Sequence, residues 1–231
     1  MKALAIDTSS FVMGVSLVDG DQVLGEVITN LKKNHSIRLM PAIDELMKDA
    51  GVRPQQLERI IVAHGPGSYT GVRIGVTTAK TLASTLGIPL VGVSSIEVLA
   101  QNGRYFNGVV SPIFDARRGQ VYTGLYREVN GELTNIARDQ ICLLEDWSTH
   151  LKSQYENVLF LGNDIAIHKE VIIEKLGDRV KFGQMSDHNP RPSELARLGI
   201  SMEPAKDIHS FIPNYIRLAE AEANWLANQK K

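Results

Sequence analysis

One arrangement of predicted elements occurs twice in this chain of 231 residues, and this repeat constrains the fold more than any other feature. Residues 3–6 form an apolar run that ends at Asp7, and strands at 12–18 and 23–28 follow as a predicted hairpin. Residues 109–114 run into Asp115 in the same way, and a second hairpin follows with Asn130-Gly131 at its turn. A repeat of about a hundred residues indicates a duplicated lobe rather than a series of short units.

The segment between the two copies is predicted to complete the first lobe. Apolar residues recur at helical spacing from His35 until Gly51 ends the run, and a second helix is expected at about 70–86. Strands are predicted at 59–64 and 90–93. We place the lobe junction near Gly103, which gives lobes at 1–103 and 104–231. A C-terminal helix at about 218–228 is expected to pack back on the first lobe.

The composition fits a globular protein, with 43% hydrophobic and 22% charged residues. A net charge of −1 argues against a dedicated nucleic-acid binder, although basic pairs stand at Lys32-Lys33, Arg117-Arg118 and Lys230-Lys231. No apolar run approaches the roughly 18 residues that would span a bilayer, so no membrane association is expected. The first apolar run is too short for a signal peptide and indicates a buried strand.

Cys142 is the only cysteine, so a disulfide within the chain is excluded and a cytoplasmic location is expected. A lone cysteine can be a nucleophile, but Cys142 lies in the apolar stretch Ile141-Cys142-Leu143-Leu144. We therefore expect it to pack in the core.

Two lobes that each open with a hairpin carrying an Asp resemble the superfamily of actin, Hsp70 and the sugar kinases. This resemblance implies an α/β fold of two lobes, each with a mixed sheet and flanking helices. It also implies hairpins that face each other across a cleft and bind nucleotide phosphates and Mg²⁺. Asp7, Asp115, Arg117 and Arg118 are then a possible vestigial nucleotide site. Equally, each Asp can cap its own turn, because Asp side chains accept hydrogen bonds from nearby backbone amides.

The most specific segment is HGPGSYTGVRIG at residues 64–75. It has neither the Gly-Lys-Ser/Thr of a Walker A loop nor the spacing of a dinucleotide-binding loop. It predicts a strand, a tight Gly-Pro-Gly turn, and a helix capped by Ser68 or Thr70. Amides at such a helix start can hold an anion, but capping alone also explains the hydroxyl residues.

This segment, with AIDTSS near the start and FDARRGQVY in the second lobe, is similar to the TsaB family, also called YeaZ. Further matches are His35-Ser36, Gly92-Val93-Ser94 and Pro213-Asn214-Tyr215-Ile216-Arg217, so the resemblance covers nearly the whole chain. It implies a subunit without catalytic activity that pairs with the transferase TsaD and the ATPase TsaE. That machinery forms N6-threonylcarbamoyladenosine at position 37 of tRNAs that read codons beginning with A. The resemblance thus implies contact with tRNA through the complex.

The catalytic relative in this machinery holds a metal with two histidines four residues apart on one helix, after Gly-Val. In this chain Ser95 and Leu99 stand at those positions, and no two of the six histidines lie three to five residues apart. We therefore predict no metal site, no cofactor and no catalytic residue. His35 begins a helix, where a capping or interface role is expected rather than a ligand role.

A candidate partner surface lies in the predicted helix at 70–86, where small residues recur every fourth position at Gly71, Gly75, Ala79 and Ala83. Glycine inside a helix is unfavourable by about 1 kcal/mol relative to alanine, so two on one face indicate close packing. The packing partner is either another chain or this protein's own sheet. The helix at 36–50 offers a second candidate surface with Leu39, Ile43 and Met47. The resemblance implies that TsaD binds through such helices, and a homodimer can use the same surface when TsaD is absent.

Three other functions compete with this interpretation. A small-molecule kinase would use Asp7 and Asp115, a metallopeptidase would need the missing histidine pair, and a dimerisation module would belong to another pathway. Arg117 and Arg118 either contact tRNA or nucleotide, or form a solvated turn.

Overall fold

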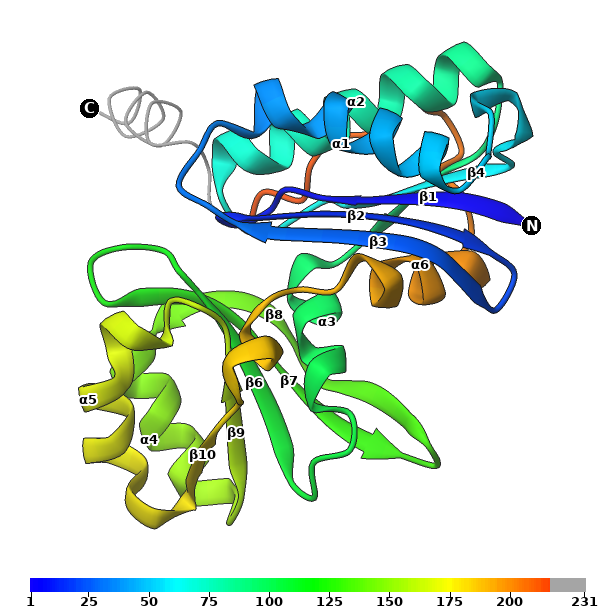
Figure 1. Cartoon of the computed structure of the whole chain (residues 1–231). Coiled ribbons are helices and arrows are strands. Elements are labelled where there is room, and N and C mark those ends of the chain that lie inside the picture. Colours follow the sequence, from blue (N-terminus) through cyan, green and yellow to red (C-terminus); the bar gives the residue numbers. More distant parts are fainter. Residues whose placement is uncertain (217–231) are drawn as a thin grey trace.

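The computed structural model describes residues 1–216 and contains two lobes, each with a five-stranded mixed sheet (Figure 1). The first sheet has the strand order β3-β2-β1-β4-β5, and the second has the equivalent order β8-β7-β6-β9-β10. In each sheet the first three strands are antiparallel and the remaining pairs are parallel. The predicted duplication and the two-lobe α/β fold are therefore confirmed.

The strands of the first sheet are β1 (Lys2–Asp7), β2 (Val12–Asp19), β3 (Gln22–Asn30), β4 (Arg59–Ala63) and β5 (Leu90–Val93). Those of the second are β6 (Val109–Asp115), β7 (Gln120–Val129), β8 (Glu132–Leu143), β9 (Val158–Leu161) and β10 (Val180–Phe182). The helices are α1 (His35–Asp49), α2 (Tyr69–Leu86), α3 (Ser95–Ala100), α4 (Leu144–Gln154), α5 (Ile165–Leu176) and α6 (Pro192–Ser201).

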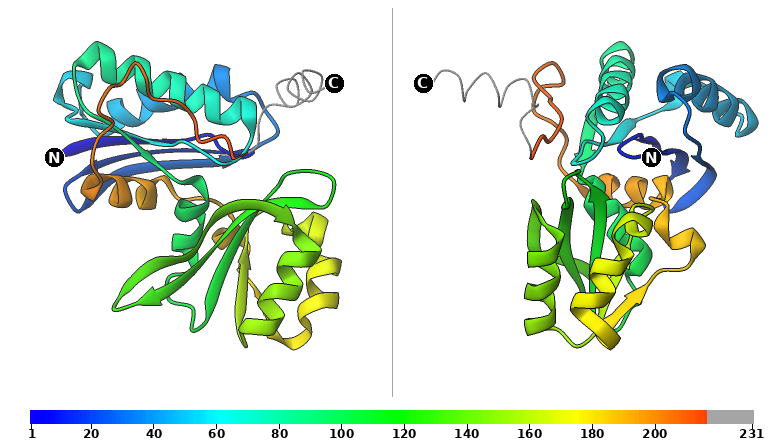
Figure 2. Two further views of the ribbon diagram at one scale, coloured as in Figure 1. Left: turned by 180° about the vertical axis from the view of Figure 1, so that it is seen from behind. Right: turned by 90° about the vertical axis from the view of Figure 1, so that its left-hand side faces the viewer.

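Helices cover both faces of each sheet, which explains why β1 and β4 are apolar along nearly their whole length. Helices α1 and α2 pack on one face of the first sheet, and α4 and α5 occupy the corresponding face of the second (Figures 1 and 2). Helix α2 ends at Leu86, and the capping residue Gly87 has a left-handed φ of 66°, which glycine adopts without the steric cost of a Cβ atom.

The remaining two helices are exchanged between the lobes. Helix α3 follows β5 but packs on β6 and β7, and α6 follows the second sheet but packs on β1 and β2. Leu195 and Ala196 of α6 join an apolar cluster with Ala3 and Ala5 of β1. The predicted division into 1–103 and 104–231 therefore needs correction, because each range includes a helix that completes the core of the other lobe.

After α6 the chain returns along the first lobe to the start of α2 (Figure 2). Ala205 N donates to Leu90 O at 2.8 Å, and Lys80 Nζ donates to the carbonyl oxygens of His209 and Phe211, both at 2.8 Å. The predicted helix at 218–228 lies outside the described residues. Within residues 1–216, no helix has the length and apolar character needed to cross a membrane.

Candidate functional site

A cavity of about 980 Å³ separates the two lobes where their first hairpins face each other. We call it the interlobe cleft. Its walls are residues 9–11, 32–35, 67–71, Ile74, 114–118, Tyr122, Asp164 and Ile167. The cleft thus combines both hairpin turns, the start of α2 and the loop before α1. Of the four residues predicted as a vestigial nucleotide site, Asp115, Arg117 and Arg118 line it, and Asp7 does not.

Asp7 is buried beneath the first hairpin turn. Its Oδ1 accepts hydrogen bonds from Ser9 N at 2.8 Å and Ser9 Oγ at 2.7 Å, whereas Oδ2 has no hydrogen-bond partner among the described residues. Burial raises the pKa of the Asp7 carboxyl. The interpretation of Asp7 as a turn cap is therefore confirmed.

Asp115 occupies the equivalent position in the second lobe but has different partners. Its Oδ1 lies 3.0 Å from His168 Nε2, and its backbone N donates to Asp164 Oδ2 at 2.8 Å. Burial is the main cause of the raised pKa of Asp164, and the neighbouring charge of Asp115 adds to it. Asp164 and His168 were not predicted as site residues from the sequence. The repeat itself could have indicated Asp164, because Gly162-Asn163-Asp164 follows β9 as Gly65-Pro66-Gly67 follows β4.

The glycines at the start of α2 allow it to pack directly on the first hairpin. A Cβ atom at Gly67 would lie 2.2 Å from Ser9 O, and one at Gly71 would lie 2.1 Å from Thr8 O. Ser68 caps the helix, because its Oγ accepts from Gly71 N at 3.3 Å. The capping interpretation of Ser68 is confirmed, and the alternative cap Thr70 is exposed.

The small-residue stripe on α2 belongs to the core of this chain. Gly71, Gly75, Ala79 and Ala83 are buried against the first sheet, and a Cβ at Gly75 would lie 2.5 Å from Thr8 Oγ1. The prediction that this stripe contacts a partner is therefore wrong for the folded chain, since the sheet already occupies its surface. Leu39, Ile43 and Met47 of α1 are also buried in that core.

An apolar groove of about 410 Å³ lies between α1 and α2, and Ile43 and Met47 form part of its lining. Met40, Leu82 and Leu86 also line it. Met40 and its neighbour Ile37 are 46% and 70% exposed, which is unusual for large apolar side chains on one helix.

Ser95 and Leu99 both lie in α3 with no exposed surface. Ser95 Oγ accepts a hydrogen bond from Gly65 N at 3.0 Å, and Leu99 packs against the second sheet. Residues 1–216 contain no group of three or more His, Cys, Asp or Glu side chains arranged to hold a metal ion. His35 is buried, with Nε2 2.8 Å from Ser10 O, and the cap of α1 is Asn34 rather than His35.

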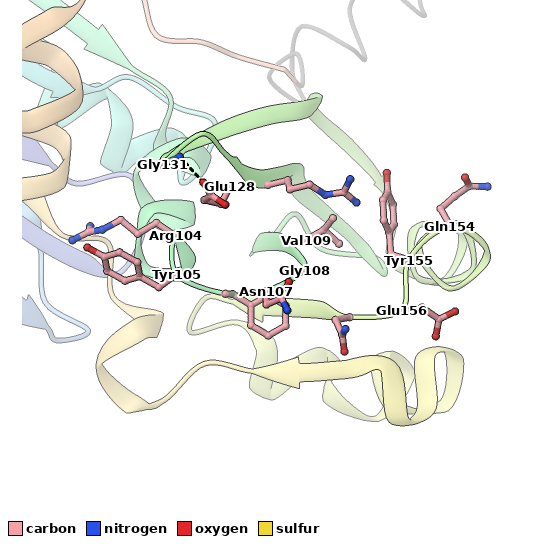
Figure 3. A pocket seen from close by; sticks show the side chains of 13 residues that line it. Arg104, Tyr105, Asn107, Gly108, Val109, Glu128, Gly131, Gln154, Tyr155 and Glu156 are labelled. Atoms are coloured by element: carbon pink, nitrogen blue, oxygen red, sulfur yellow. Dashed lines mark hydrogen bonds between the residues drawn. The ribbon is translucent and has the colours of Figure 1, made fainter.

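A further cavity of about 680 Å³ lies in the second lobe, near the ends of β7 and α4 (Figure 3). Its arginines are engaged within the chain. Arg127 stacks 5.3 Å from the ring of Tyr155, and Arg104 stacks 4.8 Å from Tyr105 and pairs with Glu194. These internal contacts account for the arginines, and we assign no site to this cavity.

Comparison with known proteins identifies the family of this chain. The family described as "TsaD: tRNA N6-adenosine threonylcarbamoyltransferase" matches residues 22–225. The "tRNA threonylcarbamoyladenosine biosynthesis protein TsaB" of Bacillus subtilis is 56% identical over 230 residues, which cover 100% of both chains. The structure of YeaZ from Pseudomonas aeruginosa has a TM-score of 0.78 at 25% identity, covering 93% of this chain and 99% of that one.

A sugar kinase shares the fold more distantly. An inorganic polyphosphate/ATP-glucomannokinase from Arthrobacter matches with a TM-score of 0.53 at 13% identity, over 87% of this chain and 99% of that chain. This likeness confirms the predicted fold of the actin and sugar-kinase type. The full-length match to the Bacillus subtilis protein and the similarity to the YeaZ structure lead to one conclusion: the chain belongs to the TsaB family, also called YeaZ.

Proposed function

We propose that the chain is a non-catalytic subunit needed to form N6-threonylcarbamoyladenosine at position 37 of tRNAs that read codons beginning with A. The observation that carries the proposal is the 56% identity, over the full length of both chains, to a protein named for biosynthesis of this nucleoside. The buried Ser95 and Leu99 support the non-catalytic role, since neither side chain provides the imidazole that the catalytic relative uses.

The experiment that tests this role is the depletion of the protein in cells that carry no second copy of the subunit. Mass spectrometry of digested tRNA then measures threonylcarbamoyladenosine against unmodified adenosine. We expect the modified nucleoside to fall as the protein is depleted and to return when the gene is supplied again. Unchanged modification after complete depletion would refute the proposal.

We also propose that the chain acts by binding TsaD, with TsaE in the larger complex, and forms a homodimer in isolation. The groove between α1 and α2 supports this partner surface, because the exposed Met40 lines it and Ile37, three residues earlier on α1, is exposed as well. A helix of the partner packing on this groove would bury Ile37 and Met40 and fill the apolar space between them and Leu82.

Two substitutions on α1 test the surface. Ile37→Glu with Met40→Glu places two charges in the proposed contact, and an unpaired buried charge typically costs about 3–5 kcal/mol. We expect co-purification with TsaD to be lost while thermal melting stays near that of the wild type, since both side chains are exposed in the free chain. Ile136→Glu on β8 is the matched control, because Ile136 is 41% exposed and lies on the other lobe. Retained binding by the double variant would rule out this surface.

A further inference from the structure

Two basic pairs line the interlobe cleft, one from each lobe. We call them the basic rim. Lys32 and Lys33 belong to the loop before α1, and Arg117 and Arg118 to the turn between β6 and β7. All four side chains are exposed, and all four line the same cavity. The charge of this rim contrasts with the net charge of −1 for the whole chain and makes the mouth of the cleft attractive to an anion.

The carboxylates of the cleft lie in its second-lobe wall. Asp115 is paired with His168, and Asp164 accepts a hydrogen bond from the Asp115 backbone. A phosphate beside Asp115 and Asp164 would meet these two carboxylates, whereas a phosphate beside the basic pairs would meet the lysines and arginines. The charges therefore favour phosphates beside the basic pairs and a neutral, hydrogen-bonding group beside the carboxylates.

The turn that carries the arginines has an uncommon backbone. Arg117 and Arg118 have φ angles of 65° and 56°, so two consecutive residues with side chains adopt the left-handed conformation. The turn is closed by hydrogen bonds from Ala116 N to Gln120 O at 2.9 Å and from Gln120 N to Arg117 O at 3.0 Å. Left-handed residues are what a tight hairpin turn requires, and this turn places Arg117 and Arg118 at the wall of the cleft.

Aromatic side chains line the same cavity. Phe11 and Tyr69 are 57% and 46% exposed, and Tyr122 lies on the opposite wall. Single-stranded RNA is bound by stacking its bases on aromatic rings while basic side chains contact the phosphates. A carboxylate such as that of Asp115 or Asp164 accepts hydrogen bonds from exocyclic amines of bases and from ribose hydroxyls.

We propose that the interlobe cleft binds an unpaired stretch of RNA, with phosphates on the basic rim and a base between the lobes. The inference rests on the proposed function, which supplies tRNA as the RNA. A free nucleoside triphosphate fits these observations less well, because its adjacent phosphates would need the cations in one cluster. Here the cations form two pairs on opposite walls, which suits phosphates spaced along a strand.

Fluorescence anisotropy of a labelled single-stranded RNA, titrated with the purified chain over a series of salt concentrations, tests the inference. The variant Lys32→Ala with Arg117→Ala removes one cation from each wall. The control Lys181→Ala with Lys206→Ala removes the same charge from exposed positions outside the cleft. We expect the slope of log affinity against log salt to become shallower by about 1.4 in the first variant, since each phosphate contact on a single strand contributes about 0.7. The control should leave the slope unchanged.

Phe11→Ala tests the base-stacking part separately. We expect it to weaken RNA binding by about five- to a hundredfold with an unaltered salt slope, because a stacked base is lost without a change in charge. Circular dichroism should remain that of the wild type, since Phe11 is largely exposed.

Excess ATP with Mg²⁺ distinguishes a site for the phosphates of an RNA strand from a site for a free nucleotide. We expect it to leave RNA bound, whereas displacement of the RNA would identify a free-nucleotide site and overturn the inference. The inference is also overturned if the chain does not bind RNA at low salt, or if the control weakens binding as much as the cleft variant. These failures would leave the depletion experiment unaffected, so the role in tRNA modification is tested independently.

Discussion

Replacing Gly71 with Ala tests whether α2 begins in direct contact with the first hairpin. The added Cβ would lie 2.1 Å from Thr8 O, although ordinary contacts of a Cβ begin near 3.4 Å. The two backbone segments must therefore separate by about 1.3 Å. That movement also strains the hydrogen bond from Thr8 Oγ1 to Gly71 O, which is 2.7 Å long.

The sign of the stability change decides between two views of this glycine. In a helix that packs on nothing, Gly→Ala stabilises the protein by up to about 1 kcal/mol. Forcing a methyl group into a packed contact costs about 1–3 kcal/mol, and weakening the Thr8 hydrogen bond costs about 1 kcal/mol more. We therefore expect Gly71→Ala to lower the free energy of unfolding by about 1–3 kcal/mol after the helix-propensity gain is subtracted.

Urea unfolding followed by circular dichroism measures this free energy. An unchanged slope of the unfolding free energy against urea concentration would show that the substitution does not alter the surface exposed on unfolding. Ser84→Ala is the matched control, because Ser84 is exposed on the same helix and lacks such a contact. If Gly71→Ala is as stable as the wild type or more so, the close approach of α2 to the hairpin is not present and the reasoning fails.

Three further predictions concern single buried or half-buried groups. Burial raises the pKa of Asp7, so the folded state loses stability as pH rises above the ordinary value of 3.8. Urea unfolding should therefore find Asp7→Asn more stable than the wild type at pH 7, with the difference vanishing below about pH 4. Burial raises the pKa of the Cys142 thiol to about 11, so a thiol reagent at pH 8 should react about a hundredfold faster with the urea-unfolded chain than with the folded one. Arg59 donates hydrogen bonds to the carbonyl oxygens of Gly199 at 2.9 Å and Ile200 at 2.7 Å. Urea unfolding should therefore show that Arg59→Ala lowers the free energy of unfolding by about 2–3 kcal/mol, whereas Arg138→Ala at an exposed position should leave it almost unchanged.

The order of the main elements of the first lobe and the opening hairpin of the second lobe were predictable from the sequence, because strands and helices have different periods of apolar residues. Both hairpins, α1, α2 and the strands that flank them follow that rule. An apolar face on a helix shows that this face is buried, but it does not show which sheet buries it. Helices α3 and α6 were not predicted, and their exchange between the lobes could not be read from a local pattern.

The same limit explains the wrong prediction for the small-residue stripe. Gly71, Gly75, Ala79 and Ala83 show that another surface comes close to α2, and both a partner helix and the chain's own sheet meet that condition. The structure resolves the choice through Thr8, whose backbone and hydroxyl occupy the space beside the two glycines. Nothing in the local sequence around α2 indicates that Thr8 lies there.

The two hairpin aspartates show which properties of a site an internal repeat predicts. Asp7 is followed by Thr8 and Ser9, so its carboxylate finds donors two residues away and turns inward. Asp115 is followed by Ala116 and Arg117, which offer no hydroxyl, and its carboxylate instead lies beside His168 at the cleft wall. Equivalent positions in a repeat therefore share backbone geometry, while the residues that follow decide the chemistry.

Contacts between the two exchanged helices connect the lobes that form the walls of the cleft. Helices α3 and α6 lie between the two sheets (Figure 1). Arg197 of α6 donates a hydrogen bond of 2.7 Å to Oε1 of Gln101, the residue that follows α3. Arg104, just beyond α3, forms an ion pair with Glu194 of α6. Any change in the distance between the Lys32-Lys33 pair and the Arg117-Arg118 pair must therefore alter these contacts between the two lobes. A ligand that bridges both basic pairs without disturbing these contacts would lose less conformational freedom on binding, which favours affinity.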